Sequence, residues 1–149
     1  DRVHAGKGFF FFHFNMDLSN GPCVAKRLSG CGAGHEYFAV AENGDLYPCH
    51  QFVGRKRYKL GSIYDGVTDE ELPPYFRESH VLNKEKCADC WARFFCSGGC
   101  HANADLFHGD IRKPYEVGCE IQKKRLECAL YVQALLALEK EEQVQAAAL

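Results

Sequence analysis

The sequence lacks the features that mark several large classes of protein. It has no apolar run long enough to span a bilayer, and its formal net charge is only −2. Neither a membrane protein nor a general binder of nucleic acid or anionic lipid is therefore indicated. Its first residues show no secretory signal pattern. We expect a cytoplasmic domain with no nucleic-acid or membrane partner.

An initiator methionine and internal repeats are also absent. The chain opens with Asp1-Arg2-Val3, and we interpret it as part of a longer protein. Residues 8–14, GFFFFHF, are apolar and too short for a buried helix, which predicts a buried strand. Such a strand favours aggregation when it is exposed, so we expect an upstream domain to cover it. The 149 residues suffice for one compact domain.

Cysteine is the residue that the chain has in unusual number, with nine in 149 residues. The odd count and the missing export signal argue against a secreted disulfide scaffold. Four of the nine fall within residues 87–100, CADCWARFFCSGGC, at the spacing C-x2-C-x5-C-x3-C. Thiols spaced so closely are typical of metal sites in a reducing compartment.

A β-hairpin is predicted over residues 36–52, EYFAVAENGDLYPCHQF. Two strand-like runs flank Asn43-Gly44, the dipeptide that best tolerates the positive φ angles of a type I′ turn. Because a tight turn brings distant residues together, Cys31 and Cys49 are expected near the base of the hairpin.

Helices are predicted on both sides of the closely spaced cysteines. Pro73-Pro74 opens a helix that we expect to run to Leu82. Residues 101–107 predict a short helix that Gly109 ends. From Glu120 onward the chain is rich in Leu, Ala, Glu, Lys and Gln, which predicts a long C-terminal helix.

The residues between the cysteines suit an iron–sulfur cluster. Gly98-Gly99 leaves room for a cluster and lets backbone N–H groups point at its sulfide, and those hydrogen bonds tune the reduction potential. Trp91, Phe94 and Phe95 are expected to limit solvent access. Zinc is the alternative, although a structural zinc site usually has two C-x2-C pairs and this sequence has one. His50 and His101 each follow a cysteine, but histidines beside ligands are more often supporting residues.

The number of cysteines favours two [4Fe–4S] clusters, each of which takes up to four thiolates. Cys128 is not expected to be a ligand. It lines up with Ile121, Val132 and Leu135 at helical spacing and is expected to be an ordinary buried thiol. The predicted fold is thus a small, irregular α+β domain stapled by clusters, with a hairpin and short helices around two sites. Eight cysteines lie in glycine-, proline- or turn-rich surroundings: Cys23, Cys31, Cys49, Cys87, Cys90, Cys96, Cys100 and Cys119.

The full pattern resembles a known family. It reads Cys31-x12-Gly44-x4-Cys49, a gap, C-x2-C-x5-C-x3-C, and x18 to Cys119. This is similar to the SPASM domain, the auxiliary iron–sulfur domain of many radical S-adenosylmethionine (SAM) enzymes that modify peptides. The segments GPCVAKRLSGCGAGHEYFAV, DLYPCHQFVG and CSGGCHANA look most like the thioether-forming maturases of SCIFF peptides, which are small cysteine-rich ribosomal peptides.

The resemblance implies how the thiols are divided between two auxiliary clusters. In SPASM domains the last cysteine of the closely spaced run crosses to the other cluster. Carried over, the first cluster takes Cys31, Cys49 and Cys100. Cys23 either completes that cluster or leaves one iron open for a thiolate of the substrate peptide, and we favour the open site. The second cluster takes Cys87, Cys90, Cys96 and Cys119.

The resemblance also implies a function and a domain organisation. We expect 1–22 to end an upstream radical SAM domain or linker strand, 23–120 to be the SPASM-type domain, and 121–149 to be the C-terminal helix. The domain would bind a cysteine-rich precursor peptide and handle its thiolate and an electron as a Cys-to-Cα thioether forms. A reductant such as flavodoxin or ferredoxin is the expected electron source.

One element of the family is missing from these residues. No C-x3-C-x2-C motif, which holds the SAM-cleaving cluster, occurs in the sequence. We therefore expect S-adenosylmethionine and a third cluster to belong to the upstream domain, and the fragment alone to be inactive. A stand-alone two-cluster electron carrier and a zinc-stabilised interaction module are the alternative functions.

Overall fold

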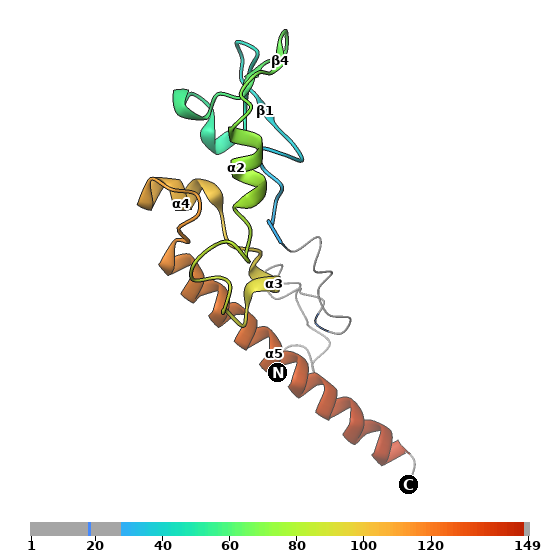
Figure 1. Cartoon of the computed structure of the whole chain (residues 1–149). Coiled ribbons are helices and arrows are strands. Elements are labelled where there is room, and N and C mark those ends of the chain that lie inside the picture. The colour runs from blue at the N-terminus through green and yellow to red at the C-terminus, as the bar shows by residue number, and fades with distance from the viewer. Residues whose placement is uncertain (1–17, 19–27, 148–149) are drawn as a thin grey trace. The chain divides into compact units, whose positions relative to one another are not determined.

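The computed structural model describes residues 18 and 28–147. It divides the chain into two compact units, one of Pro22–Cys119 and one that combines Asp1–Gly21 with Glu120–Leu149. The strand predicted over 8–14 and Cys23 lie outside the described residues. The described part of the chain is a small α+β structure with one antiparallel sheet and a long C-terminal helix, as expected (Figure 1).

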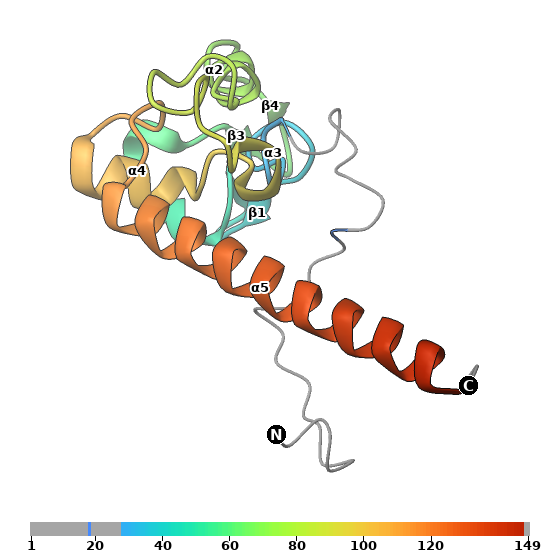
Figure 2. The same ribbon diagram turned by 90° about the horizontal axis from the view of Figure 1, so that it is seen from below.

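The sheet belongs to the unit Pro22–Cys119 and has four short antiparallel strands in the order β1-β2-β3-β4. Their bounds are β1 Ala39–Val40, β2 Asp45–Tyr47, β3 Gly61–Ser62 and β4 Gly66–Val67. Ala39 pairs with Tyr47 across the first hairpin, and Leu46 pairs with Gly61 across the next ladder. The predicted hairpin is confirmed as β1-β2, and β3 and β4 extend it into a sheet that the sequence did not indicate (Figure 2).

The turn between β1 and β2 differs from the predicted type I′ turn. Gly44 has a φ of +85°, but Asn43 has no positive φ, which a type I′ turn requires at both central residues. The N–H of Gly44 donates to the carbonyl of Ala41 at 2.9 Å instead, so the turn spans four residues. The Asn43 side chain bonds to the backbone N–H of Asp45 at 3.1 Å, an Asx-type contact that stabilises this geometry.

Aromatic rings form the core of the unit Pro22–Cys119. Phe52 comes from the 3₁₀ helix η2 (His50–Phe52), and Tyr58 comes from η3 (Lys56–Tyr58). Phe76 comes from α2 (Leu72–Glu78), and all three side chains are buried. The Phe52 ring lies 4.5 Å from Tyr58 and 5.5 Å from Phe76 between centroids, in tilted and edge-to-face arrangements that aromatic pairs favour. Tyr58 lies within the basic stretch 55–59, so this stretch also contributes a residue to the core.

The three predicted helices are present in the described chain, although the bounds of two of them differ from the prediction. Prolines occupy the first turn of α2, where their missing N–H costs nothing, but α2 ends before the expected Leu82. The short helix α3 (Arg93–Cys96) was not predicted. The predicted short helix is confirmed as α4 (His101–His108), and Gly109 ends it with a φ of +67°. The long helix is α5 (Glu116–Ala147), which begins four residues earlier than predicted.

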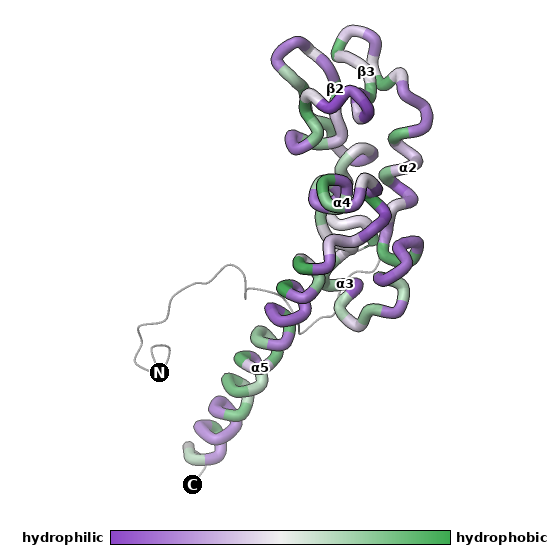
Figure 3. The backbone as a smooth tube through the Cα atoms, turned by 90° about the vertical axis from the view of Figure 1, so that its left-hand side faces the viewer, coloured by the Kyte–Doolittle hydropathy of each residue, from purple (hydrophilic) through white to green (hydrophobic). Residues whose placement is uncertain are grey.

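The burial pattern along α5 corrects one prediction. Cys128 is half-buried rather than fully buried, and Ile121, Val132 and Leu135 are exposed. Leu126 and Ala129 are the buried positions instead. Polar and apolar residues are mixed around this helix (Figure 3), so helical spacing from Cys128 alone could not select the buried side. No helix among the described residues is both long and apolar enough to cross a membrane.

Candidate metal centre

Three of the predicted ligands form what we call the first thiol group: Cys31, Cys49 and Cys100. Cys49 directly precedes η2, is buried, and has extended backbone with φ −159°. Burial is the main cause that raises the pKa of its thiol, and the charges of Cys100 and Cys31 raise that pKa further. The backbone N–H groups of Gln51 and Phe52, both in η2, oppose these effects and favour the thiolate. The three thiols are thus close enough to act on one another.

Tyr37 belongs to the same neighbourhood, although its ring is partly exposed. Burial of its hydroxyl raises the pKa of Tyr37 to about 12, helped by the charge of Cys31 and a hydrogen bond with that thiol. The charges of Cys49 and Cys100 contribute in the same direction. The neutral Tyr37 hydroxyl is therefore a hydrogen-bonding group at the first thiol group, and nothing in the sequence marked it.

The remaining predicted ligands form the second thiol group: Cys87, Cys90, Cys96 and Cys119. Burial raises the pKa of the Cys87 thiol to about 11, against the opposing charge of Lys84. The charges of Cys119, Cys96 and Cys90 raise it as well. The structure therefore brings these four thiols into one electrostatic neighbourhood, separate in membership from the first group.

Consecutive turns and helix ends position the second thiol group. The Cys87 N–H donates to the Lys84 carbonyl at 2.9 Å, and the Cys90 N–H donates to the Cys87 carbonyl at 3.1 Å. Cys96 is the last residue of α3. Cys119 lies in the first turn of α5, where the positive end of the helix dipole stabilises a thiolate.

A left-handed segment separates Cys96 from Cys100. Ser97, Gly98 and Gly99 have φ values of 59°, 83° and 73°, and Ser97 is the one positive-φ residue other than glycine among the described residues. Glycine occupies this region freely, whereas a serine there is strained. A Cβ at Gly99 would meet no atom within 4 Å, so the backbone at this point faces open space. This segment turns the chain so that Cys96 and Cys100 serve different thiol groups.

His101, which follows Cys100 in the sequence, is a buried polar side chain. It is 3% exposed, and its ring packs edge-on against Phe76 at 5.4 Å between centroids. Burial lowers its pKa to about 4, and the charge of Lys84 lowers it further. Neither ring nitrogen makes a hydrogen bond of good geometry to a described residue, although the Ile111 backbone acts on the ring as a weak partner that raises its pKa. A buried neutral imidazole normally has a partner, so this orphan beside Cys100 suits a bound group with acceptor atoms, such as cluster sulfide.

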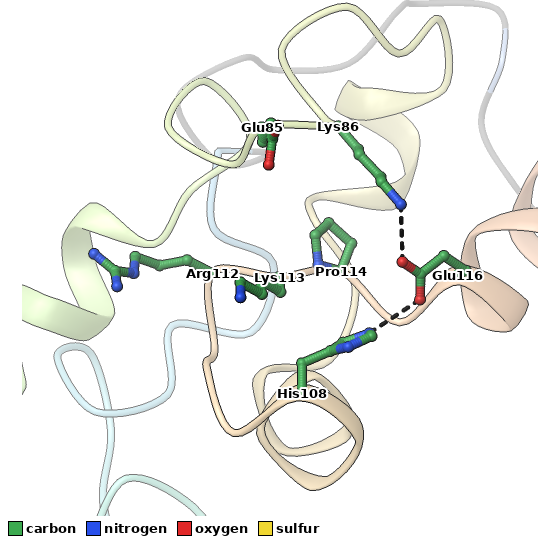
Figure 4. A pocket seen from close by; sticks show the side chains of 7 residues that line it. All are labelled: Glu85, Lys86, His108, Arg112, Lys113, Pro114 and Glu116. Atoms are coloured by element: carbon green, nitrogen blue, oxygen red, sulfur yellow. Dashed lines mark hydrogen bonds and ion pairs between the residues drawn. The ribbon is translucent and has the colours of Figure 1, made fainter.

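A polar pocket of about 180 Å³ adjoins the second thiol group in sequence, since Lys86 precedes Cys87 and Glu116 lies three residues before Cys119. Glu116 accepts from Lys86 Nζ at 2.9 Å and pairs with His108 Nε2 at 3.0 Å (Figure 4). The hydrogen bond from Lys86 is the main reason that the pKa of Glu116 falls to about 2. The opposite charges of Lys86 and Glu116 therefore neutralise each other in this pocket.

The thiols do not form the compact arrangement that one metal ion needs. Within the part of the chain that the structure describes, no three His, Cys, Asp or Glu side chains form a group able to hold a metal ion. A tetrahedral zinc–thiolate site with bonds of about 2.3 Å brings its sulfur atoms to about 3.8 Å from one another. The structure joins no two of its described cysteines by a disulfide. Of the two histidines considered as ligands, His50 is exposed and His101 is buried.

Comparison with known proteins leaves the family open. No family model matches the chain. A protein of Archaeoglobus fulgidus, named "Uncharacterized protein", is 32% identical over 101 residues, which cover 65% of this chain and 24% of the relative. The chain thus spans about a quarter of that relative's length. Neither finding bears on the resemblance to SPASM domains, which stays a prediction.

Proposed function

We propose that this chain is the auxiliary iron–sulfur domain of a radical SAM enzyme that forms thioether links in a cysteine-rich ribosomal peptide. One [4Fe–4S] cluster would be held by Cys31, Cys49 and Cys100. The other would be held by Cys87, Cys90, Cys96 and Cys119. Such clusters supply one-electron transfer and, at an open iron, a Lewis-acid site for a thiolate.

The observation that carries the proposal is the electrostatic grouping of the thiols. The thiolate charges that act on Cys49 come from Cys100 and Cys31, and those that act on Cys87, beside that of Lys84, come from Cys119, Cys96 and Cys90. These are the two sets that the SPASM pattern assigns to separate clusters. The four thiolates around a cubane bind four different irons, so they need not converge as tightly as thiolates around one ion.

The side chains around the thiols suit bound clusters. Lys84 offers a buried positive charge to thiolates of both groups, and His101 offers an unsatisfied imidazole beside Cys100. Tyr37 offers a neutral hydroxyl at Cys31. In the proposed enzyme these groups would orient and stabilise bound sulfur, and the partly exposed first thiol group would be the side that meets the peptide's thiolate.

The radical-generating chemistry would lie outside these residues. An upstream domain of the same protein would carry the C-x3-C-x2-C motif and generate the 5′-deoxyadenosyl radical that removes a hydrogen atom from the peptide. A cytoplasmic, reducing environment would keep the thiols reduced. A small redox protein such as flavodoxin or ferredoxin would supply electrons.

Anaerobic reconstitution with iron and sulfide tests the proposal. We expect about eight iron atoms per chain, the sum of two four-iron clusters, and broad visible absorbance. Uptake of zinc with no iron–sulfur absorbance would favour the zinc-stabilised module instead. A cysteine-rich precursor peptide is then added to the reduced protein. A change in the cluster EPR signal supports a peptide-modifying role, whereas an unchanged signal points to a stand-alone electron carrier.

A further inference from the structure

Lys84 is a lysine in the interior of the unit Pro22–Cys119. Only 1% of it is exposed, and its Nζ donates to the Gly98 carbonyl at 2.9 Å. No carboxylate among the described residues forms an ion pair with it. Lysine is almost never buried completely without a partner of opposite charge, because removing an ammonium from water is costly. One carbonyl oxygen does not offset that cost.

The ionisable groups whose charges act on the Lys84 ammonium are thiols. Burial lowers the pKa of Lys84, and the opposing charges come from Cys87, Cys96, Cys100 and Cys119. Three of these belong to the second thiol group, and Cys100 belongs to the first. His101 also lies within electrostatic reach, but it is neutral near pH 7 because burial depresses its pKa to about 4. The negative charge available to Lys84 is therefore that of thiolates.

The Lys84 ammonium lies against the left-handed segment between Cys96 and Cys100. A Cβ at position 98 would lie 3.5 Å from Lys84 Nζ and 3.4 Å from Val81 Cγ1. These are ordinary contact distances, so the Lys84 ammonium packs directly against the backbone at Gly98, whose φ of +83° favours glycine. The placement combines a buried cation, a fixed hydrogen bond and thiols from both groups.

We propose that the Lys84 ammonium is the built-in counter-charge of the two clusters and raises the reduction potential of the cluster held by the second thiol group. This inference rests on the proposed function, since it requires the thiols to be ligands. Reduction of a [4Fe–4S] cluster adds one electron from an external one-electron reductant, with no bond made or broken and no proton moved. A fixed positive charge in a medium of low dielectric constant stabilises the reduced, more negative cluster more than the oxidised one.

The test is a redox titration of the iron-loaded full chain, with dithionite as reductant and EPR as readout. We expect Lys84→Gln to change the ratio of oxidised to reduced cluster at least tenfold at a given potential, which is about 59 mV towards more negative midpoint for a one-electron couple. Lys84→Arg keeps the charge and should keep the midpoint. Lys86→Gln is the matched control, because Lys86 is also near Cys119 but its side chain is 62% exposed, and solvent screens it. It should shift the midpoint far less.

The outcomes separate the inference from the proposed function. If the unaltered chain takes up no iron, the proposed function fails before Lys84 is tested. If Lys84→Gln holds full iron with an unchanged midpoint, or shifts it no more than Lys86→Gln does, the counter-charge is disproved. Should Lys84→Gln fail to load iron, Lys84→Arg decides. Loading restored by arginine supports the need for charge, and failure of both variants shows that only the shape of lysine matters.

Discussion

Arg55 and Asp105, fifty residues apart in sequence, form an ion pair in which Nη1 of the arginine donates to Oδ2 of the carboxylate at 2.8 Å. The hydroxyl of Tyr58 donates to the other oxygen of the same carboxylate. The Asp105 side chain is 10% exposed, and α4, which carries it, starts directly after Cys100. This network therefore links the segment that follows Cys49 to the helix that follows Cys100, and both cysteines belong to the first thiol group.

Removing the charge of Asp105 should weaken the domain. We expect Asp105→Asn to lower the free energy of unfolding by about 2 kcal/mol, because it replaces charge-assisted hydrogen bonds in a mostly buried site. Urea unfolding of the iron-loaded chain, followed by circular dichroism, measures the change. Asp65→Asn is the control, since Asp65 accepts from Ser62 on an exposed turn and its loss should cost less than about 0.5 kcal/mol. Equal effects would show that the network adds nothing.

The ionisation of Tyr58 should be displaced to high pH. Burial is the main cause that raises its pKa above the ordinary value of 10.0, and the hydrogen bond to Asp105 adds to the shift. Its contribution to stability is therefore present below pH 10 and lost as the pH rises above that value, where the unfolded chain ionises first. In a titration followed by tyrosinate absorbance, the wild type and Tyr58→Phe should release the same number of protons from tyrosine up to about pH 11. One fewer tyrosinate in the variant would contradict the prediction.

Two glycines with the same backbone angle should respond differently to alanine. Gly34 and Gly54 both have a φ of +80°, so each alanine costs about 1–2 kcal/mol of backbone strain. A Cβ at Gly34 would also lie 2.7 Å from Cγ of Phe76, whereas one at Gly54 would meet nothing within 4 Å. We expect Gly34→Ala to cost about 1–3 kcal/mol more than Gly54→Ala in urea unfolding, the usual penalty of overpacking a core. If Gly34→Ala costs no more than Gly54→Ala, the Phe76 ring moves aside without loss of packing energy.

Removal of one proposed ligand should remove a cluster. Cys90→Ala should take up about four iron atoms per chain instead of about eight and should lower stability, because ligation and folding are coupled in small cofactor-stapled domains. Cys128→Ala should keep the full iron content, since its thiol lies in α5 outside both thiol groups. Iron analysis after anaerobic reconstitution checks both variants. Loss of iron from Cys128→Ala would show that the ligand assignment is wrong.

The coordination of the first cluster makes a separate prediction at Cys23, which lies outside the described residues. With one iron open for a peptide thiolate, Cys23→Ala should keep about eight iron atoms per chain. A cysteine-containing peptide should then perturb the EPR spectrum of this variant as it does that of the unaltered chain. Loss of iron would instead assign Cys23 as the fourth ligand of the first cluster.

Much of the fold follows from strong local signals in the sequence. Asn43-Gly44 marks the β1-β2 hairpin, Pro73-Pro74 opens α2, and the Leu- and Ala-rich tail forms α5. The strands β3 and β4 have two residues each, too few to show the alternation of a strand. Their pairing depends on Gly61, where a Cβ would come 2.0 Å from the Gly66 carbonyl oxygen, a contact that only the folded chain shows.

The candidate site could also be predicted from the sequence only in part. Cysteine spacing and the resemblance name seven thiols, and their binding of clusters stays a prediction. The sequence did not predict the burial of Lys84, because a lysine in a loop is normally exposed. Its burial depends on the chain folding around Gly98. Tyr37 was missed for the same reason, since only the folded chain brings its hydroxyl to Cys31.

The left-handed segment Ser97-Gly98-Gly99 restricts how this sequence can change. Its three residues all have positive φ angles, and the cysteines before and after it belong to different groups of sulfur atoms. Deleting or adding one residue there would rotate Cys100 away from its group, whatever residue types remained. The interval between Cys49 and Cys87 holds Phe52, Tyr58 and Phe76 of the core, so a change of length costs little only in its exposed turn at 63–65. The interval of three residues is therefore fixed by backbone geometry, whereas in the longer interval between Cys49 and Cys87 only an exposed turn is free to differ in length.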